Sequence, residues 1–194
     1  MYSQRDEEKY ILEACKDSTN RRLLDVGAWD PKTFSNSRAL IESGWGGLLI
    51  EFSPVPLRHL VEEYRQRADV EILAAAVAVE AGLLPMHITD DAVSAPSGSE
   101  QMKRWAKDGN YIGRMLVPAV TLLDILSGFE PFDFVNIDTE GTSVDLLKVL
   151  LATEMFPRCI CFEHDGRYIE AMQAARARQY HSVYESEENV VLCL

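Results

Sequence analysis

The chain has 194 residues, 47% of them hydrophobic, which is enough for one well-buried core and too few for two ordinary domains. It carries 31 acidic against 19 basic residues, so a nucleic-acid partner would meet an unfavourable long-range field at a net charge of −12. No segment approaches the roughly 18 apolar residues that span a bilayer, and residues 1–16 lack the apolar centre of a signal peptide. We therefore expect one cytoplasmic domain, residues 1–194, that neither binds nucleic acid nor spans a membrane.

Short apolar runs alternate with amphipathic segments along the chain, a pattern typical of strand–helix–strand units and a parallel sheet. Strands are predicted at 22–26, 48–51, 70–75, 83–88, 116–120, 134–138, 159–163, 181–185 and 189–194. Helices are predicted within 1–20 and at 32–43, 54–67, 121–126, 144–152 and 167–179. A tight acidic turn joins the last two strands, and such a hairpin adds an antiparallel strand to a parallel sheet. The pattern predicts an α/β fold with helices on both faces of a mostly parallel sheet.

The four cysteines are Cys15, Cys159, Cys161 and Cys193. Cys159 and Cys161 alternate with apolar residues in a predicted strand, so both face one side of a buried sheet. Their spacing is that of neither a zinc knuckle nor a thioredoxin-type redox motif. We expect reduced thiols within the core.

One polar stretch rich in small residues, 89–101, interrupts the alternation and indicates an inserted loop within 83–120. Aromatic and basic residues lie in or beside it: Arg104, Trp105, Lys107, Tyr111 and Arg114. Such a mixture suits stacking on a sugar face, and we expect this segment to shape an acceptor site. An ordinary surface loop is the alternative.

Carboxylates end four of the predicted strands. These ends are Asp25-Val26-Gly27-Ala28, Glu51-Phe52, Asp138-Thr139-Glu140 and Glu163-His164-Asp165. In an open α/β sheet the ligand lies beyond the carboxyl ends of the strands, near the point where the strand order reverses. We therefore expect a site surrounded by acidic side chains.

The turn after the first strand disfavours a dinucleotide. A dinucleotide site needs three spaced glycines and a free helix N-terminus, whereas here only Gly27 is present, Trp29 crowds the turn, and Asp30 with Pro31 is typical of a capped helix start. A cationic or zwitterionic ligand such as S-adenosylmethionine (SAM) suits an acidic rim better. Glu51, about twenty residues further on, is placed to accept hydrogen bonds from ribose hydroxyls.

At these positions the sequence resembles the FkbM-type SAM-dependent methyltransferases, which mostly methylate hydroxyl groups of sugars and polyketide-like natural products. The resemblance covers about 23–165. It is carried by Ile137-Asp138-Thr139-Glu140-Gly141 after an apolar strand, by Asp25-Val26-Gly27-Ala28 with Ser35-Asn36, by Ile50-Glu51 with Pro54, and by Thr121-Leu122 with Asp124. The chain departs from the family where Pro31 replaces a second glycine and Phe52 replaces a frequent proline.

The resemblance implies a Rossmann-like class I methyltransferase fold with a seven-stranded sheet. It also implies roles for individual residues: Asp25, Gly27 and Ala28 at the methionine end of SAM, Glu51 at the ribose, Ala76 and Val77 beside the adenine, and Asp138 near the methyl group. Phe52 would add an aromatic face beside the adenine. The acceptor implied is a hydroxyl of a sugar, a glycan or a small natural product.

An alcohol is a poor nucleophile at neutral pH, so hydroxyl methylation calls for a general base. The candidates are Asp138, Glu140 and His164, with His164 favoured because its ordinary pKa is near neutrality. The alternative is that His164 has a structural role only, with its hydrogen bonds made to its neighbours Glu163 and Asp165.

Metal assistance is a second hypothesis for lowering the pKa of the acceptor hydroxyl. The hard oxygen and nitrogen donors of Asp138, Glu140, Glu163, His164 and Asp165 would suit Mg²⁺ or Mn²⁺.

Two further function classes remain open from the sequence. One is a non-catalytic interaction module built on a SAM-type fold, in which the acidic strand ends are merely solvated. The other is an NAD-dependent enzyme, which the turn chemistry disfavours. Binding of SAM, of NAD, or of neither distinguishes the three.

Overall fold

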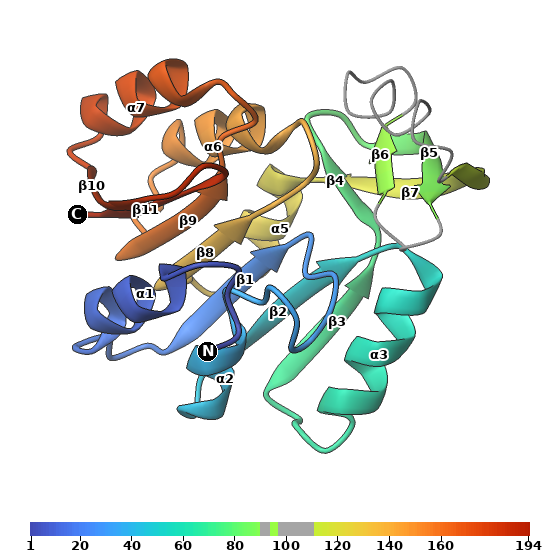
Figure 1. The fold of residues 1–194 in the computed structure, drawn as a ribbon, viewed down its shortest axis with the longest axis horizontal. Coiled ribbons are helices and arrows are strands. Elements are labelled where there is room, and N and C mark those ends of the chain that lie inside the picture. Colours follow the sequence, from blue (N-terminus) through green and yellow to red (C-terminus); the bar gives the residue numbers. More distant parts are fainter. Residues whose placement is uncertain (90–93, 97–110) are drawn as a thin grey trace.

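The computed structural model describes residues 1–89, 94–96 and 111–194. Its larger sheet has seven strands in the order β10-β11-β9-β8-β1-β2-β3 (Figure 1). Their bounds are β1 Arg22–Val26, β2 Gly46–Glu51, β3 Val70–Ala74, β8 Phe134–Ile137, β9 Cys159–Glu163, β10 His181–Glu185 and β11 Asn189–Cys193. β11 runs antiparallel to both β10 and β9, while the other pairings among the described strands of this sheet are parallel. The predicted fold class is confirmed.

Helices cover both faces of this sheet (Figure 1). One face is covered by α1 (Glu7–Cys15), α2 (Arg38–Glu42) and α3 (Pro54–Tyr64), and the other by α5 (Leu122–Gly128), α6 (Ser143–Leu151) and α7 (Tyr168–Ala177). Because side chains alternate along a strand, Leu23 packs with the first set and Leu24 with the second. Both leucines are fully buried, and each such burial stabilises the fold by about 1.5–3 kcal/mol.

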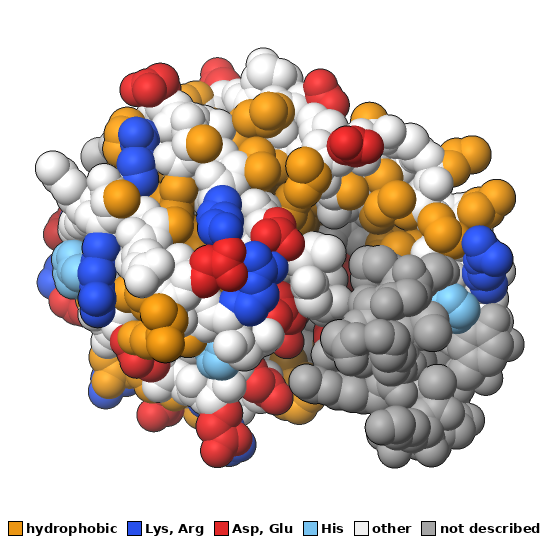
Figure 2. Space-filling model, turned by 90° about the horizontal axis from the view of Figure 1, so that it is seen from above, with side chains coloured by type: hydrophobic (Ala, Val, Ile, Leu, Met, Phe, Trp, Pro, Cys, Tyr) orange, Lys and Arg blue, Asp and Glu red, His pale blue; other side chains and the backbone are white. Residues whose placement is uncertain are grey.

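A smaller sheet, in the order β4-β7-β5-β6, stands beside the first. Its strands are β4 Ala76–Ala78, β5 Gly82–Thr89, β6 Ser94–Pro96 and β7 Tyr111–Thr121. Buried Ala75 separates β3 from β4, so one stretch of chain leaves the larger sheet and enters the smaller one. Met86 and Val117 are buried on its inner side, whereas Leu83 and Leu116 are exposed, and Figure 2 shows apolar side chains gathered at this end of the molecule.

The helix predicted at 32–43 is wrong over its first half, because α2 begins only at Arg38. Asp30 does accept hydrogen bonds in the manner of a helix cap, from the backbone N–H groups of Lys32 (2.9 Å) and Thr33 (2.7 Å). These bonds close a turn that leads into Phe34 at a positive φ, which ends any helical run. The capping pattern therefore marks a turn here. No helix in the described ranges is long and apolar enough to cross a membrane.

Candidate active site

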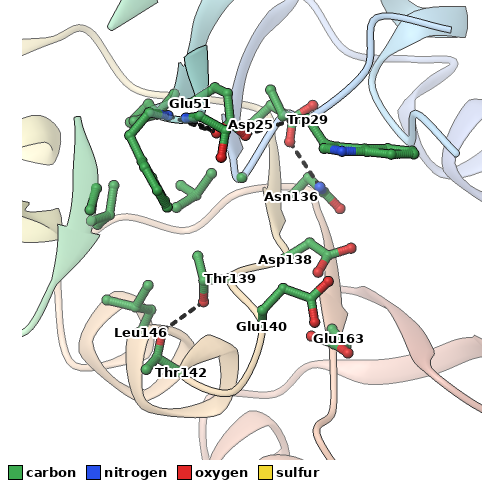
Figure 3. A pocket seen from close by; sticks show the side chains of 18 of the residues that line it. Asp25, Trp29, Glu51, Asn136, Asp138, Thr139, Glu140, Thr142, Leu146 and Glu163 are labelled. Atoms are coloured by element: carbon green, nitrogen blue, oxygen red, sulfur yellow. Dashed lines mark hydrogen bonds between the residues drawn. The ribbon is translucent and has the colours of Figure 1, made fainter. Parts of the chain in front are cut away.

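A pocket of about 510 Å³ opens at the carboxyl ends of β1, β2 and β8, where the strand order reverses on either side of β1 (Figure 3). Its walls come from the loops after these strands, from Ala75 to Val79, from β5 and from the start of α6. All the positions expected to hold SAM line it: Asp25, Gly27, Ala28, Glu51, Phe52, Ala76, Val77 and Asp138. The volume is within the range of small-molecule sites.

Gly27 allows the loops after β1 and β8 to approach each other closely. Its φ is +84°, and a Cβ atom there would lie 1.7 Å from the backbone oxygen of Asp138. The N–H groups of Gly27 and Ala28 both donate to the carbonyl of Ile50 at 3.0 Å, while Asp138 N–H donates to Val26 at 2.8 Å. Only glycine fits between the loops, so its place in the motif has a packing cause.

Backbone donors hold the carboxylate of Glu51 in place. Its Oε1 accepts from the N–H groups of Phe52 (2.7 Å) and Ser53 (2.6 Å), and its Oε2 accepts from that of Trp29 (3.1 Å). Burial raises the pKa of Glu51, and these three hydrogen bonds oppose the rise because they favour the charged form. Each oxygen retains acceptor capacity toward the pocket.

A buried chain of polar side chains lies under the pocket. Asn36 Nδ2 donates to Asn136 Oδ1 at 3.2 Å. Asn136 Nδ2 in turn donates to Asp25 Oδ1 at 2.8 Å, a bond that Figure 3 shows. Burial raises the pKa of Asp25, which the hydrogen bonds from Ser37 and Asn136 counteract. Asn36 lines the pocket, and its buried Oδ1 has no hydrogen-bond partner. A buried acceptor without a donor costs free energy of folding, and a bound ligand that supplies a donor would remove this cost.

The opposite end of the pocket is apolar. Ala76 and Val77, expected beside an adenine, are buried there with Phe52 nearby. Leu84 and Met86 of β5 complete this wall. The inserted strands therefore help to build the pocket.

Carboxyl groups gather at the polar end, where Figure 3 shows Asp138, Glu140 and Glu163 close together. Loss of contact with water and the negative charge of nearby Asp25 together raise the pKa of Asp138 to about 7. Burial and the charge of Asp138 raise the pKa of Glu163 to about 11. The two carboxyls share a hydrogen bond. Near pH 7 Glu163 therefore stays protonated and donates a hydrogen bond to Asp138. Asp138 is then divided between its charged and neutral forms.

Glu140 is held by an unusual backbone conformation at the pocket wall. It has a φ of +53°, Gly141 follows at +106°, and α6 then starts at Ser143. The hydroxyl of Ser143 accepts from Thr139 N–H at 3.0 Å and fixes the loop. The strain of the left-handed conformation is thus offset by local bonding.

His164 lies apart from the pocket lining. Its Nδ1 accepts from Gly166 N–H at 3.1 Å, and its ring meets Tyr168 of α7 edge-on at 6.0 Å. Asp165, its neighbour, is likewise not a lining residue, whereas Glu163 is. The structure therefore separates His164 from Asp138 and Glu140, which do line the pocket.

The metal hypothesis is not supported. Among the residues that the structure describes, no three His, Cys, Asp or Glu side chains are arranged to hold an ion. Burial instead raises the pKa values of Asp138, Glu163 and Asp165, and repulsion among them adds to the rise for Asp138 and Glu163. The segment 89–114, expected to shape the acceptor site, falls mostly outside the described residues.

Asn36 belonged to the family motif without a predicted role, and sequence reasoning gave no role to Asn136, Leu84, Met86 and Thr142, although all of them line the pocket. Asn136 had a usable signal, because a polar residue inside the apolar run of β8 must find a buried partner. Trp29 was expected to crowd the turn. It lines the pocket and stacks on Phe34, with ring centroids 6.1 Å apart.

Comparisons with known proteins agree with this geometry. Residues 25–183 match the family model of the methyltransferase FkbM domain. The fold is similar to that of methyltransferase FkbM from Methylobacillus flagellatus KT, with a TM-score of 0.56, 10% identity, and coverage of 89% of this chain and 43% of that protein. The chain thus spans less than half of that protein's length.

Two further structures share the fold. The precorrin-6y C5,15-methyltransferase from Geobacter metallireducens GS-15 has a TM-score of 0.53 and 12% identity, with 100% of this chain and 89% of that one covered. The S-adenosylhomocysteine-bound methyltransferase PaMTH1 of Podospora anserina has a TM-score of 0.51 and 8% identity, with 98% and 79% covered. No sequence among curated proteins matches the chain significantly.

Proposed function

Because the chain belongs to the FkbM methyltransferase family, we propose that it transfers a methyl group from SAM to a hydroxyl of a sugar, glycan or small natural product. The observation that carries the proposal is the pocket at the reversal of strand order, which places two buried carboxylates, Asp25 and Glu51, opposite an apolar end. A similar fold in Podospora anserina is described as bound to S-adenosylhomocysteine (SAH), which supports the same ligand class.

The residues present fit SAM. The orphaned Asn36 Oδ1 and the carboxylate of Asp25 suit the ammonium end, since both accept hydrogen bonds. Glu51, fixed by three backbone donors, suits the two ribose hydroxyls. Phe52 and Val77 suit an adenine ring, which gains from apolar and aromatic contact.

Bound SAM supplies an electrophilic methyl group on a positively charged sulfur. The protein's own task is to align the acceptor and to remove its proton. We assign the removal to Asp138, whose ionised carboxylate takes the proton of the acceptor hydroxyl. Glu163 holds its proton and donates a hydrogen bond to Asp138, which keeps part of the base ionised near neutral pH. His164, favoured from sequence, takes no part in this assignment because it does not line the pocket.

Titration calorimetry with SAH tests the cofactor. Wild type should bind, and Glu51→Ala should weaken binding by on the order of 1–3 kcal/mol through lost ribose hydrogen bonds. Glu71→Ala is the matched control, because Glu71 is an exposed acid on β3 outside the pocket.

The outcomes separate the function classes. Binding that falls in Glu51→Ala and not in Glu71→Ala supports a SAM site in this pocket. If the wild-type protein shows no binding of SAH at millimolar concentration, the non-catalytic module becomes the better hypothesis. Binding of NAD in place of SAH would point to a dehydrogenase.

A further inference from the structure

Three of the four thiols meet at the end of the larger sheet that lies away from the pocket. Cys159 begins β9, Cys193 ends β11, and Cys15 ends α1. The thiol of Cys159 shares hydrogen bonds with those of both Cys15 and Cys193. The proposed function uses none of them.

The strand pairing brings two of these thiols to disulfide range. Cys193 lies directly opposite Cys159 in the antiparallel register, and Leu194 N–H bonds to the carbonyl of Arg158, which marks the cysteines as a non-hydrogen-bonded pair. Residues paired in this way have Cα atoms about 4.5 Å apart, which falls within the roughly 4.4–6.8 Å that a disulfide requires. Both side chains face α1, so they lie on the same side of the sheet.

The two thiols also differ in access. Cys159 is fully buried, and burial raises its pKa, whereas Cys193 is partly exposed. The hydrogen bond from Cys159, together with the charge of Arg158, lowers the pKa of Cys193. A partly exposed thiol of lowered pKa meets an oxidant first, and a buried neighbour then resolves the product.

We propose that Cys193 and Cys159 form a reversible disulfide site in the folded protein, in which Cys193 reacts first with hydrogen peroxide. The Cys193 thiolate attacks a peroxide oxygen, so that an S–O bond forms, the O–O bond breaks and hydroxide leaves. The Cys159 sulfur then attacks the Cys193 sulfur, an S–S bond forms, the S–O bond breaks, and water leaves with the Cys159 proton. A dithiol such as dithiothreitol restores both thiols. This inference depends on the fold and not on the proposed methyl transfer.

The test treats the native full chain with hydrogen peroxide and maps cross-linked peptides by mass spectrometry without reduction. Wild type should give one intramolecular Cys159–Cys193 link that dithiothreitol removes. Cys161→Ala, the matched control on the same strand and face, should give the same link, as should Cys15→Ala. Cys193→Ala should give none between these positions.

Three results would overturn the proposal. One is a link that forms in urea and not in the native protein. Another is Cys193 oxidised to sulfinic acid while Cys159 remains a free thiol. The third is a bond from Cys193 to a second chain in place of Cys159. Because Cys161→Ala removes a buried thiol of the same strand, it also shows whether the strand tolerates such substitutions.

Discussion

Asp138 shows how a single side chain takes its chemistry from its surroundings. It follows the apolar strand β8, it faces Glu163, and Asp25 lies close enough to repel its charge. An ordinary aspartate is fully ionised at neutral pH and is therefore a weak base, whereas a carboxylate with a pKa near 7 can both accept and release a proton there.

We expect Asp138 to titrate with a midpoint of about 7. Carbon-13 NMR of labelled protein measures this directly, and Asp138→Asn identifies the resonance. Asp69 serves as an internal comparison, because the adjacent Arg67 lowers its pKa. With a competent acceptor, formation of SAH should rise with pH through the same midpoint, and Asp138→Asn should slow it by about 10²–10⁴-fold. Titration of Asp138 near pH 4 would rule out the assigned base.

At the scale of elements, the pocket forms only if the loops after β1 and β8 can come into close contact. Gly27→Ala would drive a Cβ atom into the backbone of Asp138 and would also strain a positive φ. We expect a loss of about 3 kcal/mol or more of unfolding free energy, together with loss of SAH binding. Chemical denaturation measures the first and calorimetry the second.

Gly128→Ala is the control for this substitution. Gly128 ends α5 with a negative φ, and nothing lies within 4 Å of a Cβ atom built there. The change should be neutral or slightly stabilising, since alanine loses less backbone entropy than glycine on folding. Equal destabilisation by both substitutions would contradict the loop-contact explanation.

The sequence predicted the elements of the larger sheet well because their apolar runs are short and clearly bounded. Arg22–Val26 and Cys159–Glu163 are strands over the predicted residues. The first half of the helix at 32–43 failed because a capping pattern is local, and the same side-chain bonds close a turn. β4 escaped prediction because its three residues continue directly from β3 after a bend at Ala75.

The residues of the site likewise fall into those that a local pattern predicted and those that it did not. Residues at strand ends could be placed in one pocket because parallel strands deliver their carboxyl ends to one edge of the sheet. Tertiary packing, which no local pattern encodes, sets the direction of the His164 side chain. It also brings Asn36 to Asn136, a hundred residues away. The roles of individual residues toward SAM and the acceptor stay predictions.

The molecule as a whole carries several carboxyl groups that folding makes harder to ionise. The pKa values of Asp25, Glu51, Asp138, Glu163 and Asp165 are all raised. Such groups bind more protons in the folded than in the unfolded state at pH values above their ordinary pKa near 4. Their contribution to stability therefore falls as the pH rises above about 4, through about 7 for Asp138 and through about 11 for Glu163.

We expect unfolding temperatures to decline between pH 5 and 8, and Glu163→Gln to flatten the decline. At pH 8 the variant should be more stable by on the order of 1 kcal/mol, or about 2–4 °C, because a neutral amide needs no proton on folding, whereas Glu163 must take one up above its ordinary pKa. Glu154→Gln removes the same formal charge from an exposed site and should leave the slope unchanged. Scanning calorimetry across the pH range decides, and a stability that rises with pH in wild type would refute the argument.

The position of β11 also bears on how the molecule is made. This strand is the last of the sheet in chain order, yet it lies between β9 and β10, and its Val191 packs in one cluster with Ile11 of α1. While the ribosome is still adding the residues before 189, β9 has an unpaired edge and α1 lacks part of the surface that it covers. β11 therefore completes the surface under α1 and joins β10 to the sheet, which closes only once synthesis has passed residue 193.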